Sequence, residues 1–108
     1  MKASLPPRLQ SDLTQQRQAY HQEIEAQLAR WRADIATMEA ETAGKNQVDL
    51  QQRLIDLKSK LKRAETRLDK MKETTGDAWA ELQTEIDDLR QAISDSVEQA
   101  QKEFHLIS

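Results

Sequence analysis

The feature that most constrains this chain is an apolar residue at every third or fourth position, repeated along almost all of its 108 residues. Such spacing places apolar side chains on one face of an α-helix, whereas a strand needs strict alternation. With two glycines, two prolines and 32% charged residues, the sequence offers few loops and much polar surface for exposed helix faces. The pattern therefore predicts an all-α protein, with residues 1–108 as a single domain.

The first part of the pattern predicts one long helix over about residues 8–43. Pro6 and Pro7 mark its start, because proline is tolerated in the first turn of a helix but not in its interior. Gly44 favours a turn over residues 44–46, since glycine readily adopts the conformation that ends a helix. Residues 1–7 remain as an N-terminal extension. The apolar positions of this helix are Leu9, Leu13, Tyr20, Ile24, Leu28, Trp31, Ile35 and Met38.

A second series of apolar positions begins at Leu50 and continues to Phe104. If the chain folds back over residues 44–46, Met38 faces Leu50 and apolar residues meet at each following layer. This agreement predicts an antiparallel helical hairpin with coiled-coil packing, because the connection is too short for a parallel pair.

The segment 75–77 allows two structures. In the favoured one, a single helix runs from about residue 47 to about residue 105, since an interior glycine costs only about 1 kcal/mol. The alternative is a three-helix bundle with a break at 75–77, in which Gly76 caps one helix and Asp77 begins the next. We favour the long helix because it places Leu9 opposite Trp79. Its exposed apolar stripe then predicts self-association.

Charge is divided unevenly along the second half of the chain. Residues 51–75 carry eight Lys or Arg and four Asp or Glu, whereas residues 76–108 carry two and eight. The basic segment and the acidic tail are therefore expected to pair, with Arg67 near Glu85. The same pairs form whether one chain bends at Gly76 or two straight chains cross there, because the second arrangement is the domain-swapped form of the first.

Two segments carry a family resemblance. The first helix contains Tyr20, Leu28, Trp31 and Ile35 in order, and the second half contains Thr75-Gly76-Asp77-Ala78-Trp79. These features resemble a family of small bacterial coiled-coil proteins of similar length, over most of the chain from Tyr20 onward. A second glycine and tryptophan that often recur in that family are replaced here by Asp87 and Arg90. The resemblance implies a coiled-coil protein with no catalytic residues to transfer and a weak link to stress responses.

Groups that could carry chemistry are sparse. His21 and Glu25 lie one helical turn apart, but a metal site needs further ligands and none is evident. His105 lies close to the end of the predicted helix. There is no cysteine and no glycine-rich phosphate loop. We therefore expect a protein that is not an enzyme and that has no catalytic residue, cofactor or metal.

The predicted function is that of a non-enzymatic, self-associating coiled-coil protein that acts through assembly or protein–protein contact. With no signal-peptide core and no membrane span in the sequence, we expect a cytoplasmic homo-oligomer. Nucleic acid is not expected as a partner, because the acidic tail can neutralise the basic segment.

The alternative is an amphipathic helical protein that binds lipid surfaces or protects against stress. A membrane surface is the less favoured partner, since the polar face of the last helix is acidic. The residues expected to form the core and interface are Leu28, Trp31, Ile35, Leu54, Leu57, Leu61, Leu68, Trp79, Leu82, Ile86, Leu89 and Ile93.

Overall fold

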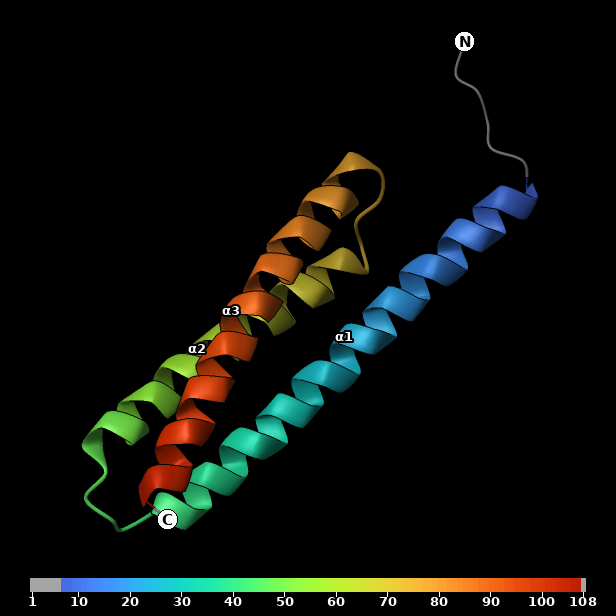
Figure 1. The fold of residues 1–108 in the computed structure, drawn as a ribbon. Coiled ribbons are helices and arrows are strands. Elements are labelled where there is room, and N and C mark those ends of the chain that lie inside the picture. The colour runs from blue at the N-terminus through green and yellow to red at the C-terminus, as the bar shows by residue number, and fades with distance from the viewer. Residues whose placement is uncertain (1–6, 108) are drawn as a thin grey trace.

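The computed structural model describes residues 7–107, with side chains described for residues 14–106. In this part of the chain there are three α-helices and no strands: α1 (Pro7–Thr42), α2 (Val48–Met71) and α3 (Asp77–Ile107). They run up, down and up in an elongated arrangement with a long axis of 64 Å (Figure 1). The all-α class predicted from the apolar spacing is confirmed.

The first helix and its turn follow the sequence closely. α1 begins at Pro7, one residue before the predicted start, and ends one residue before the predicted end. Gly44 then takes a positive φ of 78°, a backbone conformation that glycine adopts without strain. The side chain of Thr42, which is buried, donates a hydrogen bond to the Met38 carbonyl at 2.7 Å. Most of the predicted N-terminal extension, residues 1–6, lies outside the described residues.

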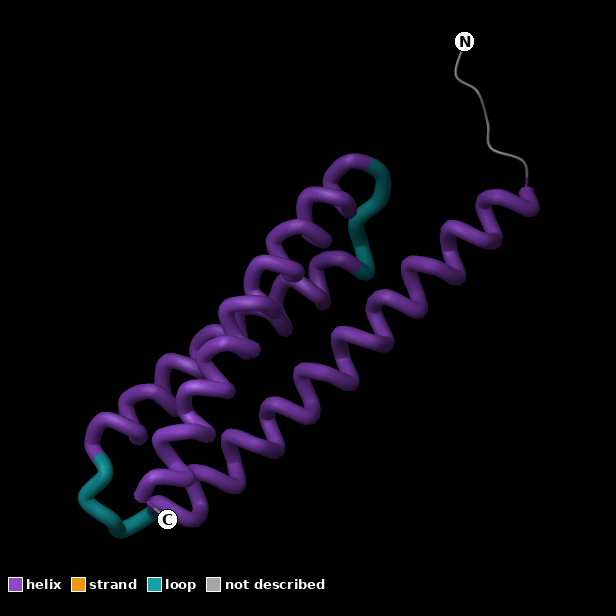
Figure 2. The backbone as a smooth tube through the Cα atoms, viewed as in Figure 1, coloured by secondary structure: helices purple, strands orange, loops and turns teal. Residues whose placement is uncertain are grey.

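In the single chain, the continuous helix predicted over about residues 47–105 is not formed, and the alternative with three helices is. α2 ends at Met71 and α3 begins at Asp77, so the connecting segment is 72–76 rather than 75–77 (Figure 2). Gly76 has a φ of 65° and turns the chain back. Reversal buries the apolar face of α3 against its own chain, whereas a straight single chain would expose that face to water. This burial outweighs the small difference in local helix propensity at Gly76.

The roles of the residues at the break also differ from the expected ones. The Gly76 carbonyl accepts hydrogen bonds from the backbone N–H groups of Trp79 at 3.1 Å and Ala80 at 3.4 Å. Gly76 thus precedes the first turn of α3, instead of capping α2. Asp77 lies within that first turn, where its carboxylate is favoured by the positive end of the helix dipole.

The core is a continuous apolar column contributed by one face of each helix. Side chains in these stripes recur at three- and four-residue spacing, so each helix keeps a polar outer face. Thr42 is also buried, and its hydroxyl is satisfied within its own helix. The buried apolar residues are Ile24, Leu28, Trp31, Ile35, Met38, Leu50, Leu54, Leu57, Leu61, Ala64, Leu68, Met71, Leu82, Ile86, Ile93, Val97 and Ala100.

The register of the α1–α2 hairpin is shifted from the predicted one. Burial of both Thr42 and Leu50 fits a pairing in which these two residues face each other. In that register, Lys58 and Glu39 are offset by about 7.5 Å along the helix axis. In the predicted register, the same offset is about 12 Å. Because the Lys58 Nζ lies 2.9 Å from the Glu39 carboxylate, only the shorter offset is within reach. The chain therefore turns about one layer later than the apolar pattern alone indicated.

Candidate functional site

The hinge end of the bundle, where residues 72–76 join α2 to α3, brings parts of all three helices together. The first half of the connection still follows α2. The N–H groups of Lys72, Glu73 and Thr74 donate to carbonyls three residues earlier, at 3.1 to 3.2 Å. The Thr74 hydroxyl also donates to the Lys70 carbonyl at 2.7 Å. The change of direction therefore lies towards the end of the connection, where Gly76 has a positive φ.

One end of α1 extends beyond the end of α2. α1 has 36 residues and α2 has 24, and α1 continues past the α2–α3 loop in Figure 1. His21 and Met71 line the same cavity, so the end of α2 lies close to the level of His21. We call residues 7–20 of α1 the overhang, because this stretch of about 20 Å has no α2 residues alongside it.

An aromatic cluster, formed by Arg17, Tyr20 and Trp79, connects the overhang to the start of α3. The rings of Tyr20 and Trp79 meet edge to face, with their centroids 5.6 Å apart. The Arg17 guanidinium carbon lies 4.9 Å from the centre of the Trp79 ring, within the range of a cation–π contact. Trp79 is half-buried, so the cluster remains partly open to solvent.

Tyr20 also makes polar contacts across the α1–α3 interface. Its hydroxyl donates a hydrogen bond to an Asp87 carboxylate oxygen at 2.7 Å, and lies 3.4 Å from the Gln83 carbonyl. Burial, followed by the hydrogen bond to the Asp87 carboxylate, raises the pKa of Tyr20 above its ordinary value. The Arg90 guanidinium acts in the opposite direction, but more weakly. The Tyr20 hydroxyl therefore keeps its proton and acts as a hydrogen-bond donor.

Arg90 extends this contact further along α1. Its Nε donates to the Gln27 side chain at 2.8 Å, and its other guanidinium nitrogens lie 3.5 Å from Glu23 and from Asp87. These contacts fix the relative position of α1 and α3 without forming an enclosed site.

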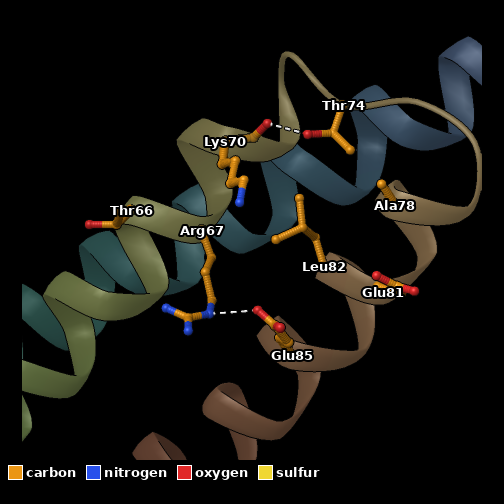
Figure 3. Close-up of a pocket in the computed structure, with 8 residues that line it drawn as sticks. All are labelled: Thr66, Arg67, Lys70, Thr74, Ala78, Glu81, Leu82 and Glu85. Carbon is orange, nitrogen blue, oxygen red and sulfur yellow. Dashed lines mark hydrogen bonds and ion pairs between the residues drawn. The ribbon is translucent and has the colours of Figure 1, made fainter.

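A shallow groove of about 350 Å³ lies between α2 and α3 next to the hinge (Figure 3). Arg67 and Glu85, which line it, form an ion pair at 2.7 Å, as the charge pattern predicted. Figure 3 shows Leu82 pointing into the space between the two helices, while Glu81 points away. The ion pair neutralises the two central charges of the groove, while Lys70 and Glu81 also belong to its lining.

A larger cavity of about 650 Å³ lies between the overhang and the hinge. Arg17, His21 and Lys72 contribute basic groups to its lining, and Met71 and Trp79 contribute apolar surface.

The predicted metal candidates do not converge on a site. His21 Nδ1 lies 3.4 Å from the Glu25 carboxylate, while its Nε2 is buried without a hydrogen-bond partner among the described residues. His105 is exposed on α3. Within residues 7–107, no three His, Cys, Asp or Glu side chains are grouped so as to hold a metal ion.

The predicted core and interface residues fall in two groups. Ten of them lie in the buried core, whereas Trp79 and Leu89 are only half-buried and pack against its edge. Sequence reasoning missed the contacts of Arg17 with Trp79 and of Tyr20 with Asp87. The signal for the latter was available, because a lone tyrosine in an apolar stripe needs a partner for its hydroxyl when buried. The ten buried residues are Leu28, Trp31, Ile35, Leu54, Leu57, Leu61, Leu68, Leu82, Ile86 and Ile93.

Comparison of the chain with family models, curated proteins and solved structures gave no significant match. The resemblance to small bacterial coiled-coil proteins therefore stays a prediction. In the described part of the chain, no helix combines the length and the apolar character needed to cross a membrane.

Proposed function

We propose that the protein works by assembly, as a non-enzymatic helical protein that associates with a second copy of itself. The observation that carries this proposal is the overhang, residues 7–20 of α1, which continues as helix beyond the end of α2. Its sequence places Leu9 and Leu13 on the same apolar stripe that forms the core further along α1.

The physical basis of helix stability supports a partner for the overhang. Most of the stability of a helix in a protein comes from packing of its apolar face, so the end of a helix gains stability from a partner. The overhang packs on the start of α3 through Tyr20 and Trp79. A second chain alongside it would supply the packing that α2 supplies to the rest of α1.

The residues at the hinge end have the character of an interface. Tryptophan, tyrosine and arginine are the types most often found to dominate binding energies at protein interfaces. Here Trp79, Tyr20 and Arg17 form a half-buried cluster directly beside the overhang.

Binding to a lipid surface is less well supported. The apolar face of α3 is turned into the core, with Ile86 and Ile93 fully buried, so this helix would have to leave the bundle to reach lipid. The acidic residues on its outer face would also be repelled by anionic headgroups.

Sedimentation equilibrium of a variant at the overhang tests the proposal. Leu9→Glu combined with Leu13→Glu removes the apolar stripe, and we expect the dissociation constant of the dimer to rise at least roughly tenfold, since each buried leucine contributes about 1.5–3 kcal/mol. The matched control, Gln15→Glu with Ala26→Glu, adds the same charge at exposed positions of α1 and should leave association unchanged. A wild-type chain that remains monomeric at every concentration contradicts the proposal, as does equal weakening by both double variants.

A further inference from the structure

We propose that two copies associate by exchanging α3. In the exchanged dimer, the segment 72–76 straightens, α2 and α3 become one helix, and α3 of each copy packs on α1 and α2 of the other. This inference rests on the proposed function, because it specifies how the second copy is held.

The hinge needs little change to straighten. The three successive N–H bonds of Lys72, Glu73 and Thr74 already continue the last turn of α2, and the Gly76 carbonyl already accepts the first bonds of α3. The departure from helix lies over Thr74, Thr75 and Gly76, and Gly76 has a positive φ. Short hinge loops of this kind favour exchange of the element that follows them.

A straight helix keeps the apolar face continuous across the hinge. Met71, Thr75 and Trp79 are spaced four residues apart, so they lie on one side of a helix that runs through the hinge. Neither threonine nor a single glycine prevents such a helix, although each lowers its propensity.

The contacts between α2 and α3 are the same in both forms. Arg67 pairs with Glu85 at 2.7 Å and Arg53 with Glu103 at 2.6 Å, and Lys60 donates to the Ser96 hydroxyl at 3.0 Å. In the exchanged dimer each of these pairs joins two copies, and the apolar column re-forms in the same way. Exchange therefore sacrifices no contact of this interface.

The exchanged dimer also adds packing along the overhang, which in the monomer is contacted by the start of α3 through Tyr20 and Trp79. Once α2 continues as a straight helix, residues 72–85 of the same chain run alongside the overhang, which has no α2 beside it in the monomer. Because Leu9 and Leu13 continue the apolar spacing of α1 in the sequence, we expect the straightened helix to cover them. This gain offsets the loss of freedom on association.

Gly76 controls the balance between the two forms. A Cβ atom built on Gly76 would meet nothing within 4 Å, so alanine there is strained by the backbone conformation and not by lack of space. Alanine avoids positive φ and favours helix. Gly76→Ala should therefore strengthen dimer formation roughly tenfold or more, because both hinges of the dimer are relieved.

The test measures the distance between α2 and α3 within one chain. Arg53 and Gln99 lie side by side in the hairpin, with Nη1 and Oε1 3.2 Å apart, and both are exposed. Because the natural chain has no cysteine, Arg53→Cys with Gln99→Cys allows both sites to carry dyes for energy transfer. Labelled chains are diluted into an excess of unlabelled chains, with circular dichroism to confirm helix content.

In the exchanged dimer the two labels are separated by about 69 Å of continuous helix, so energy transfer should fall as total protein concentration rises. Gly76→Ala should shift this fall to lower concentration. Gly44→Ala is the matched control: it places the same strain at the other turn, where a Cβ also has open space, and should leave the 53–99 transfer unchanged.

The possible outcomes separate the two proposals. A dimer with high 53–99 transfer overturns the exchange of α3 while self-association stands. Monomers at every concentration, for both the wild type and Gly76→Ala, overturn both. Should Gly76→Ala fail to fold, the wild-type measurement still decides between a bent and a straight hinge.

Discussion

Among single residues, Tyr20 holds an unusual position, because it is the one tyrosine of the chain and it links α1 to α3. Its raised pKa means that the folded protein resists ionisation of this phenol, whereas the unfolded chain ionises it near pH 10. The contribution of Tyr20 to stability is thus present below about pH 10 and is lost as the pH rises towards the higher pKa of the folded state.

The variant Tyr20→Phe separates the effect of the Tyr20 hydroxyl on stability from the effects of other groups that titrate at high pH. At neutral pH, Tyr20→Phe should lower the free energy of unfolding by about 1 kcal/mol, since one hydrogen bond is lost while Asp87 keeps Arg90 as a neighbour. Between pH 9 and about pH 11, the wild type should lose more stability than Tyr20→Phe. Urea unfolding at several pH values measures both, and ultraviolet absorbance of the lone tyrosine follows its ionisation. Parallel pH profiles for the two proteins would show that the phenol is not protected.

At the scale of the helices, α2 is the element on which the other two depend, because its buried face contributes to the core throughout its length. Leu57 is fully buried at its centre, whereas Ile55, two residues earlier, is 58% exposed on the outer face. The two side chains have similar apolar area, so their different surroundings decide their contributions.

Leu57→Ala should lower the free energy of unfolding by about 2–5 kcal/mol, because it removes apolar contacts and leaves a cavity. Ile55→Ala on the same helix should change it by less than about 0.5 kcal/mol. Thermal and urea denaturation at one fixed protein concentration compares the two. Similar losses in both variants would mean that the outer face of α2 is covered by another chain.

The sequence was sufficient to predict the helices themselves, since their apolar spacing and the glycine at position 44 leave little choice. It was not sufficient at two points. The hairpin register was misjudged because a repeating apolar pattern still matches apolar with apolar after a shift of one layer. The polar contacts between α1 and α2, such as Lys58 with Glu39 and Lys72 with Glu25, distinguish the registers. The break at Gly76 was misjudged because local propensity there differs by about 1 kcal/mol, while the outcome depends on where α3 finds its partner surface.

For the molecule as a whole, the bent and the exchanged forms share one set of α2–α3 contacts and differ mainly in length. The bent chain has a long axis of 64 Å. A continuous helix over residues 48–107 would span about 90 Å. Mass and length together therefore identify the form present in solution, and neither quantity alone does so.

The most direct measurement of assembly is molar mass by light scattering, combined with the maximum dimension from small-angle X-ray scattering, over a range of concentrations. Self-association with exchange of α3 predicts twice the chain mass of 12.4 kDa and a particle about 90 Å or more in length. A particle of 12.4 kDa that keeps the 64 Å long axis at every concentration would contradict it.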